Sequence, residues 1–501
     1  MEKRKKVIII GSGLAGMSAG YYLQQNGFDT EIFELHSSSG GLCTSWKRKN
    51  YLIDGCIHFL TGTSPKENTY QFWNDLLDMP SVDFIYQDTH AVVEDESGKR
   101  VSLYSNVDKL TDELLAIAPE DKKQILFLVK GIKKFTDMKM PVDKPYELMT
   151  LSDKLKVAYQ MLPYLYPLRR LMMISNAGFV SRLKSPRLRY AFSTAFIGEF
   201  PLFYTVMQMV WRHNKSTGYP KGGASYISGQ IENKYRNAGG VIHFNSRVSK
   251  ILVTDNTAMG IELGNGDKHY GNLIISAADG YSTIYSLLGG RYKDKNIIER
   301  YESGVFKTID KTLYVSIGVN ADFSGQPHKL YIPLAKPIHI DPLTELNLLD
   351  ITHYCDDIHA APEGKSLLTL MPQANDWEYW HNLRMDDRIH YNEEKKRIAM
   401  DIIEALENRF GNISNNVEMI DVVTPATYIR YTNNWTGGQI SWSTTRNTFG
   451  KPTTWQIKGL SNFYMTGQWA GISGGLNSVV MMGNHLTQII CKKEGISFKK
   501  K

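Results

Sequence analysis

The chain has 501 residues, of which 42% are hydrophobic and 22% charged, and it carries a formal net charge of +7. This composition is typical of a globular protein and excludes a disordered one, and the length predicts about two to four domains. No nucleic-acid-binding module accompanies the basic balance, so a nucleic-acid partner is not expected.

The four cysteines are scattered along the chain: Cys43, Cys56, Cys355 and Cys491. They form no C-x-x-C motif, so the sequence predicts neither a metal site nor a redox-active pair, and reduced thiols fit a cytoplasmic protein. No run of about 20 apolar residues occurs, so no transmembrane helix is expected. Lysine clusters at both ends are either solvated tails or contacts for an anionic membrane surface.

The first predicted element is a strand over residues 7–10, which leads into the glycine turn G-S-G-L-A-G at residues 11–16. A helix rich in small residues follows, and a second strand over residues 30–33 ends at Glu34. Strand, glycine turn, helix, strand and acid in this order form the dinucleotide-binding fingerprint. The stretch therefore predicts a Rossmann-like nucleotide site.

Each component of the fingerprint has a physical role. Gly11 permits the tight turn, Gly13 lets the backbone approach a pyrophosphate, and Gly16 lets the helix pack closely on the sheet. The N-terminus of the helix offers unpaired N–H groups to phosphates. Glu34 is placed to accept hydrogen bonds from a ribose, which disfavours a 2′-phosphate and hence NADP.

Residues 40–62 form a glycine-rich segment, at a point where a plain NAD dehydrogenase would enter another strand–helix unit. Short strands are predicted over residues 82–103. Two helices are predicted over residues 108–139, with Pro119 at the start of the second.

Residues 155–183 are apolar and aromatic, are broken by Pro163 and Pro167, and carry interspersed arginines. The prolines and arginines argue against a membrane span. Two interpretations remain open. One is a helical cap whose apolar face is buried over a cavity, and the other is an interfacial segment that dips into a bilayer with its arginines at the headgroups.

The later chain alternates helical and strand patterns. Within residues 218–290 a helix closed by Gly239 precedes short antiparallel strands, and the chain returns to a parallel sheet at residues 273–276. An α+β region follows, with an amphipathic helix over residues 393–410. A strand–glycine–helix unit over residues 460–491 offers a further helix N-terminus to a polar group.

Three separated motifs agree: the fingerprint with Gly40-Gly41, the middle block YPKGG…AGG…RVSKI…SAAD, and the later FYMTGQWAGISGGLNS. In this order they resemble the FAD-dependent desaturases and isomerases of the phytoene desaturase, carotenoid isomerase and retinol saturase group, within the amine oxidase-like flavoprotein superfamily. The likeness covers nearly the whole chain and is diffuse between residues 319 and 417. It implies FAD as the cofactor.

The resemblance implies an α/β fold. A Rossmann-like FAD-binding domain of three-layer ββα form would be interleaved with an α+β substrate domain and a helical cap that can face a membrane. The FAD-binding domain would be assembled from three segments, over residues 1–80, 218–300 and 456–501. The substrate domain would fill the intervals between them, with its helical cap over residues 81–217 and its α+β region over residues 301–455.

The resemblance also implies the cofactor contacts. The ADP half of FAD would be held by Gly11, Ser12, Gly13, Ala15, Gly16, Glu34 and Leu35. The remaining contacts would be Gly40, Gly41 and Leu42 at the pyrophosphate and flavin side, Val248 at the adenine, Gly467 and Gln468 at the ribityl–pyrophosphate, and Gly475, Leu476 and Asn477 near the isoalloxazine. Leu42 and Gln468 depart from the pattern, because many superfamily members carry an arginine and an acid there.

Three residues are candidates for catalysis. His58, in a loop expected near the flavin, is an acid–base group or a structural loop histidine. Glu199, in the apolar run FIGEFPLFY, would have a raised pKa if buried and could shuttle a proton; the alternative is a paired structural carboxylate. Trp469 either stacks near the flavin or forms part of a wall.

The sequence thus predicts an FAD-dependent oxidoreductase that desaturates, saturates or isomerises carbon–carbon bonds of a long hydrophobic, polyene or isoprenoid, substrate. An amine oxidase-like enzyme acting on C–N bonds and a non-catalytic prenyl-lipid carrier of GDI-like fold are the alternatives. No second G-x-G-x-x-G unit is present, so electrons would be exchanged with an external partner: oxygen, a quinone or a reduced carrier.

Overall fold

A five-stranded parallel sheet carries the fingerprint. In the computed structural model, which describes residues 4–445, 447–448, 450–471 and 474–500, its strand order is β10-β2-β1-β14-β20. The strands are β1 (Lys6–Ile10), β2 (Asp29–Phe33), β10 (Val241–His243), β14 (Leu273–Ser276) and β20 (Phe463–Met465). The central β1 pairs in parallel with β2 and β14. Its apolar residues are buried, as expected for a strand that is covered on both faces.

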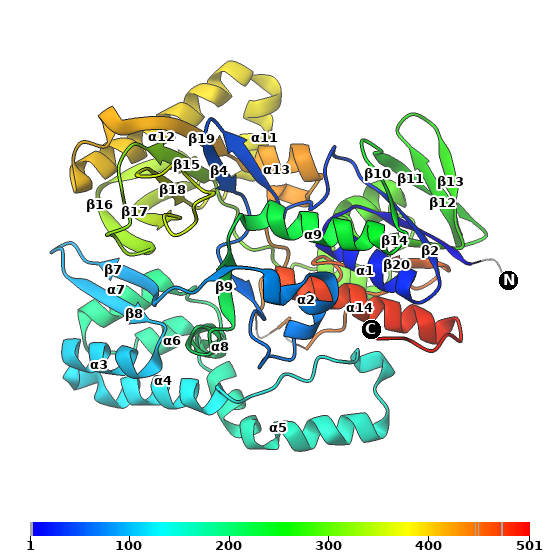
Figure 1. The fold of residues 1–501 in the computed structure, drawn as a ribbon, viewed down its shortest axis with the longest axis horizontal. Helices are drawn as coiled ribbons and strands as arrows, with labels where there is room; N and C mark the ends of the chain where they lie inside the picture. The colour runs from blue at the N-terminus through cyan, green and yellow to red at the C-terminus, as the bar shows by residue number, and fades with distance from the viewer. Residues whose placement is uncertain (1–3, 446, 449, 472–473, 501) are drawn as a thin grey trace.

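Helices from distant regions of the chain pack together on this sheet (Figure 1). α1 (Leu14–Gln25) lies on β1 and β2, and α9 (Gly223–Asn237) and α14 (Leu476–Lys493) both pack against α1. An antiparallel sheet of β11 (Val248–Thr254), β12 (Thr257–Leu263) and β13 (Lys268–Tyr270) contacts β14. The predicted antiparallel insertion and the return to the parallel sheet at residues 273–276 are confirmed.

A seven-stranded sheet with the order β19-β15-β18-β17-β16-β7-β8 forms the second half of the molecule. Its strands are β7 (Thr89–Glu94), β8 (Arg100–Tyr104), β15 (Tyr314–Val319), β16 (Lys329–Asp341), β17 (Thr344–His353), β18 (Ser366–Leu370) and β19 (Val417–Val423). Leu330 and Ile332 share a hydrophobic core with α12 (Arg388–Phe410), next to α11 (Trp377–Asp386). Tyr314 and Leu367 belong instead to the core of the first half. The sheet therefore joins the two halves by its opposite faces.

Short elements connect these layers. The hairpin of β3 (Ser45–Arg48) and β4 (Tyr51–Asp54) reaches β19, where Trp46 and Arg48 both donate to Asp421 at 2.9 Å. β9 (Thr217–Pro220) pairs with β5 (Leu60–Thr61) and β6 (Phe84–Ile85). The remaining helices of this region are α2 (Tyr70–Leu76), α10 (Lys295–Tyr301) and α13 (Pro425–Thr432).

A helical region lies beside β7 and β8. A hydrophobic core is enclosed by α3 (Val107–Ile117), α4 (Lys122–Phe135), α6 (Asn176–Val180), α7 (Pro186–Ala195) and α8 (Leu202–His213). α5 (Leu151–Met172) lies at the lower edge of Figure 1 and packs against α4 and α8. The expected break at Pro163 and Pro167 is wrong, because α5 continues through both. Leu171 is the one fully buried residue of α5, while Met161, Tyr164 and Leu168 pack partly buried against the helical core, so the two interpretations of residues 155–183 both stay predictions. Among the described residues, no helix combines the length and apolarity needed to cross a bilayer.

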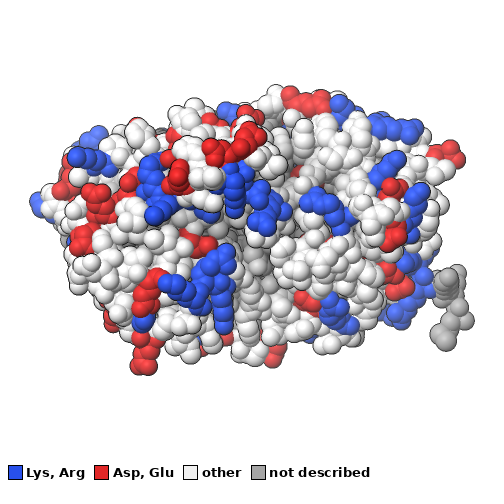
Figure 2. Space-filling view, turned by 90° about the horizontal axis from the view of Figure 1, so that it is seen from above, with Lys and Arg blue, Asp and Glu red and all other residues white. Residues whose placement is uncertain are grey.

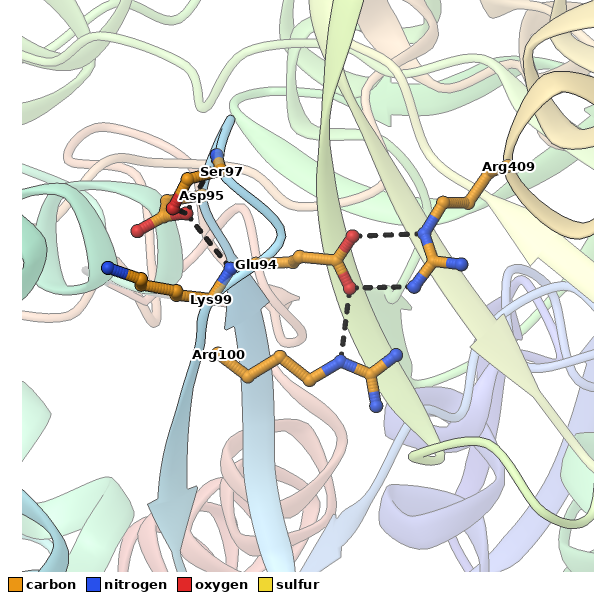
Figure 3. A network of polar contacts seen from close by, with 6 residues as sticks. All are labelled: Glu94, Asp95, Ser97, Lys99, Arg100 and Arg409. Carbon is orange, nitrogen blue, oxygen red and sulfur yellow. Dashed lines mark hydrogen bonds and ion pairs between the residues drawn. The ribbon is translucent and has the colours of Figure 1, made fainter.

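Glu94 of β7 ties two strands of the seven-stranded sheet, β7 and β8, to α12 (Figure 3). Its carboxylate accepts hydrogen bonds from Arg409 Nε and Nη2 at 2.9 and 2.8 Å and from Arg100 Nε at 3.0 Å, and its side chain is only 7% exposed. Burial raises the pKa of Glu94, but the bonds from Arg409 and Arg100 outweigh burial and hold the pKa below its usual value. Since Arg409 ends α12 and Arg100 lies on β8, one carboxylate joins three elements.

Replacement of this carboxylate tests the junction. Glu94→Gln is expected to lower the free energy of unfolding at neutral pH by about 1–2 kcal/mol, since the charged hydrogen bonds weaken and the two arginines are partly solvated. The loss should vanish as the pH falls through the depressed pKa of Glu94, where the wild type also loses the charge. Urea denaturation at neutral and acid pH measures both effects. Glu96→Gln, at an exposed neighbouring position, is the control, and equal losses in the two variants would contradict the assignment.

Candidate functional site

The fingerprint loop and the Gly40-Gly41 turn lie against each other. Gly40 N–H donates to Ser12 C=O at 2.9 Å, and Gly13 and Gly40 form a parallel bridge. A Cβ on Gly16 would lie 2.1 Å from Gly11 O, so only glycine permits this approach of helix and turn. Two backbone segments thus line one loop at the N-terminus of α1.

The later glycine motif reaches the same place. Gly467, which follows β20, has a φ of +92°, and a Cβ there would lie 3.3 Å from Ala15 Cβ. Ser18 Oγ of α1 donates to Val480 C=O of α14 at 2.8 Å, across 462 positions of sequence. Segments from both ends of the sequence therefore meet at the start of α1.

This junction fits a polar ligand with phosphate groups. The N-cap positions of α1 and α14 are Gly13 and Gly475, and neither helix has a side-chain cap. A Cβ on Gly13 would meet no neighbour closer than 4.0 Å, and one on Gly475 would meet nothing within 4 Å. Buried oxygens of Thr466 and Asn477 have no hydrogen-bond partner among the described residues. Free N–H groups, open space and unpaired acceptors together match the needs of a dinucleotide such as FAD.

Glu34 is buried beside the loop. Its Oε2 accepts from both N–H and Oγ of Ser12 at 2.7 Å, and its Oε1 accepts from the N–H of His36 at 2.8 Å. Ser246 N–H donates to Glu34 C=O at 2.7 Å, which brings the chain just before Val248 to the end of β2. The predicted ribose acid and the predicted adenine contact therefore lie on neighbouring segments.

The other predicted cofactor residues lie in different surroundings. Leu35, Leu42 and Leu476 are half-buried. The amide of Gln468 bonds with the segment before Trp442: Oε1 accepts from Ser441 N–H at 3.2 Å and Nε2 donates to Gln439 C=O at 3.4 Å. In this structure the amide of Gln468 is used within the protein.

Asp54 anchors the segment that leads to His58. Its Oδ1 accepts from Cys56 and Ile57 N–H at 2.9 and 2.8 Å, and its Oδ2 accepts from Ala224 N–H at the start of α9 at 2.8 Å. Burial raises the pKa of Asp54 to about 6, although the hydrogen bonds oppose the rise. The carboxylate joins the loop to α9, a role that the sequence reasoning did not assign.

His58 lies between tyrosines. Its Nδ1 is 3.3 Å from Tyr354 Oη, and its ring is stacked against Tyr314 with centroids 6.0 Å apart. Burial, with a smaller contribution from the charge of Lys329, lowers the pKa of His58 to about 4. The imidazole is therefore neutral at physiological pH.

The other two catalytic candidates differ in their surroundings. Glu199 is exposed, so the burial on which its role as a proton shuttle depended is absent. The sequence shows an apolar run around Glu199 but not the direction in which its side chain points. Trp469 is 3% exposed and packs in an aromatic cluster with Trp442 and Phe306, and its Nε1–H donates to Asn434 Oδ1 at 2.8 Å. This packing is compatible with a wall, and a position of Trp469 near the flavin stays a prediction.

On β16 and β17, polar side chains lie on the face of the seven-stranded sheet that turns away from α12. Lys329 and Tyr331 alternate on β16 with Leu330, which packs on α12. Lys329 pairs with Asp350 of β17 and donates to Thr352 Oγ1 at 3.1 Å. This pattern places a cation inside the molecule.

Further cationic and imidazole groups surround Lys329. We call His58, His90, Arg212, His328 and Lys329 the polar cluster. Burial is the main cause that lowers the pKa of Arg212 to about 10 and of His328 to about 3. The Lys329 charge adds to the lowering for His58, His90 and His328, so these groups lie near one point. Nitrogens of His90, Arg212 and His328 are buried without a hydrogen-bond partner among the described residues.

Sequence reasoning singled out His58 but missed His90, Arg212, His328 and Lys329, because the members of the polar cluster come from distant segments. The only local signal is a charge within an apolar pattern, such as Lys329 in KLYIP or Asp350 in NLLDITH. Such a residue marks a strand face that is not plain hydrophobic core.

Comparisons with known proteins agree with this arrangement. The family model described as NAD(P)-binding Rossmann-like domain matches residues 9–76. The chain is 22% identical to a 4,4'-diapophytoene desaturase (4,4'-diapolycopene-forming) of Methylomonas sp, over 100% of this chain and 98% of that protein. It is 24% identical to the chloroplastic prolycopene isomerase 1 of an Oncidium hybrid cultivar, over 85% and 73% of the two chains. The chain is thus similar to a carotenoid desaturase over its full length and to a prolycopene isomerase over most of it.

Solved structures share the fold of this chain. A triple mutant of putrescine oxidase has a TM-score of 0.61 at 12% identity, over 98% of this chain and 99% of that one. The predicted α/β class with a Rossmann-like domain is confirmed. The predicted domain boundaries stay predictions.

Five buried or half-buried histidines make the fold sensitive to acid. Burial lowers the pKa of His58, His90, His328, His353 and His485. Free histidine takes up a proton near pH ~6.5, so below that pH the unfolded chain binds protons that the folded protein does not. Folding stability therefore falls as the pH is lowered.

His58→Gln tests this linkage, because glutamine keeps a polar group beside Tyr354 but does not titrate. The free energy of unfolding of the wild type should decline between about pH 6.5 and 4, and the variant should lose less by up to about 3 kcal/mol. Denaturant titrations over this pH range measure the slope. His390→Gln, at an exposed position, should leave the slope unchanged; a slope identical in all three proteins would refute the neutral state of His58.

Proposed function

We propose that this protein uses bound FAD to desaturate, saturate or isomerise carbon–carbon bonds of a long apolar polyene or isoprenoid. The observation that carries the proposal is the match to diapophytoene desaturase over the full length of both chains. The meeting of three glycine-rich segments at the start of α1 supports it.

FAD would be held by the residues that the sequence suggested: the fingerprint with Glu34 and Leu35, residues 40–42, Val248, Gly467-Gln468 and residues 475–477. The open N-termini of α1 and α14 would face its phosphates and ring. When bound, the flavin supplies the group that accepts or donates a hydride. Electrons would pass to or from an external acceptor or donor, such as oxygen, a quinone or a reduced carrier.

The chain's own groups would orient the substrate. His58, neutral and beside Tyr354, would act as a hydrogen-bonding group and not as a charged acid. The unpaired nitrogens of Arg212 and His328 favour a substrate with one polar end, because a pure hydrocarbon would leave these buried groups without partners.

The two other functions receive less support. Amine oxidation would call for an aromatic cage that leaves room at the flavin, whereas Trp435, Trp442 and Trp469 pack on one another. A non-catalytic prenyl-lipid carrier of GDI-like fold would not need the open, uncapped fingerprint around Gly13.

Anaerobic flavin spectroscopy tests the proposal. The purified protein should show the visible bands of bound FAD, and a long-chain carotenoid-type polyene, but not a primary amine, should change them. Gly13→Ala is the matched variant: the fold has room for its methyl group, yet that group would stand where the pyrophosphate binds. We expect the variant to keep the thermal stability of the apoprotein and to lose FAD, while Gly229→Ala, also in open space, retains FAD. Bleaching by amines alone, or no flavin in any preparation, would overturn the proposal.

We also propose that α5 rests on an anionic membrane surface. Leu151, Leu155, Tyr159, Leu162 and Tyr166 follow one face of the helix at intervals of three and four residues, and each is between 62% and 81% exposed. Lys154, Lys156, Arg169 and Arg170 provide positive charge on the same helix. An exposed apolar stripe with basic flanks is typical of an interfacial helix, and a polyene dissolved in lipid would be reached from there.

Vesicle flotation measures this contact. Wild-type protein should float with vesicles that contain anionic phospholipid, and Leu155→Asp/Leu162→Asp should bind about 100-fold more weakly, because two leucines no longer enter the apolar boundary. Both positions are exposed, so the thermal midpoint should stay close to that of the wild type. Ile389→Asp, on the 74% exposed Ile389 of α12, serves as the control. Wild-type protein that stays unbound at low salt would remove α5 as a membrane contact.

A further inference from the structure

A small basic cavity lies outside the candidate flavin site. It has a volume of about 150 Å³ and is enclosed by β3, α11, α12, β19 and α13. Its charged lining consists of Arg48, Arg384, Arg388, Lys395, Arg430 and Asp421. Figure 2, which looks down on the upper side of Figure 1, shows basic side chains gathered near the middle of this face.

The positive charge of the cavity is mostly uncompensated. Arg48 pairs with Asp421 at 2.9 Å, and Asp421 also accepts from Trp46. For Arg384, Arg388, Lys395 and Arg430 the described residues provide no carboxylate within ion-pair distance.

The cations of the cavity contact aromatic rings, where carboxylates would be the more common partners. Arg388 and Lys395 lie over the ring of Tyr391 at 4.8 and 5.3 Å, and Arg430 lies over Tyr431 at 4.9 Å. Burial is the main cause that lowers the pKa of Lys395, and Arg388, Arg48 and Arg384 lower it further. Asp421 offsets part of this effect. Like charges gathered around one cavity repel one another, and an anion bound there would relieve the repulsion.

We propose that this cavity binds a small anion of phosphate or diphosphate type, either free or as the end of a larger molecule. Several arginines favour phosphate oxygens, which they can bind with two parallel hydrogen bonds. A cavity of about 150 Å³ leaves room for an anionic group of this size.

The position of the cavity separates this anion from the phosphates of FAD. Tyr431, on its rim, contacts the ring of His36 at 5.3 Å, and His36 follows the ribose acid Glu34 by two residues. The cavity thus borders the outer end of the nucleotide loop, whereas the N-terminus of α1 lies at Gly13. The proposal does not depend on the substrate or the reaction of the flavin.

Calorimetric titration of FAD-saturated protein tests this site. Inorganic diphosphate should bind with saturation at one site, with an affinity that falls as salt is raised, and should raise the thermal midpoint. Lys395→Gln and Arg384→Gln should each weaken binding at least about tenfold, since each removes a charged contact. Lys396→Gln, which removes an exposed charge next to Lys395 on α12, should bind as the wild type does.

Two further measurements identify the source of the anion and separate lost binding from lost folding. Dioctanoyl phosphatidic acid tests a lipid headgroup as the source: tighter binding than diphosphate indicates a headgroup, and weaker binding indicates a free phosphate compound. Thermal midpoints without ligand separate lost binding from lost folding. The proposal is overturned if neither ligand binds with saturation, or if Lys396→Gln weakens binding as much as Lys395→Gln does.

Discussion

Close backbone approach around α1 is the constraint on which the rest of the structure depends. The helix is buried from Leu14 to Gln24. The elements around it approach its backbone closely only where small residues stand. A Cβ would lie 2.1 Å from a backbone oxygen at Gly16, 2.7 Å from the Tyr235 ring at Gly20, and 2.6 Å from Ala19 N at Gly483. The fingerprint turn, α9 and α14 can therefore approach α1 only because glycines stand at the contact points. The close packing of these elements fixes the conformation of the nucleotide loop.

The same dependence explains why much of the fold could be predicted from sequence. β1, β14 and β20 are short apolar runs next to glycine turns, and α9 shows Ile227, Ile231 and Tyr235 on one face. These are local signals of elements that are buried where the pattern predicts. For α5 the local signal was misleading, since the prolines predicted a break that the helix does not have. Pro163 and Pro167 each remove one backbone hydrogen bond, but in a mostly exposed helix water can bind the carbonyls that lose their partners.

Only part of the candidate site could be predicted from the sequence. The glycines and Glu34 could be predicted from their spacing, since backbone conformation and ribose recognition require those residue types. Arg212, His328 and Lys329 could not, because strand alternation tells which residues share a face but not which faces meet across distant segments. Glu199 failed for the converse reason: an apolar neighbourhood in sequence does not fix the direction in which one side chain points.

The contact between Ser18 and Val480 also has a consequence for how the protein is made. During synthesis α1 emerges early, but α14, its partner across 462 positions, emerges only after the seven-stranded sheet has been translated. Until then the apolar surface of α1 has no cover from α14, and Gly467 is absent from the loop. Maturation of the nucleotide site thus follows translation of nearly all of the intervening chain, and truncated products lack a completed site.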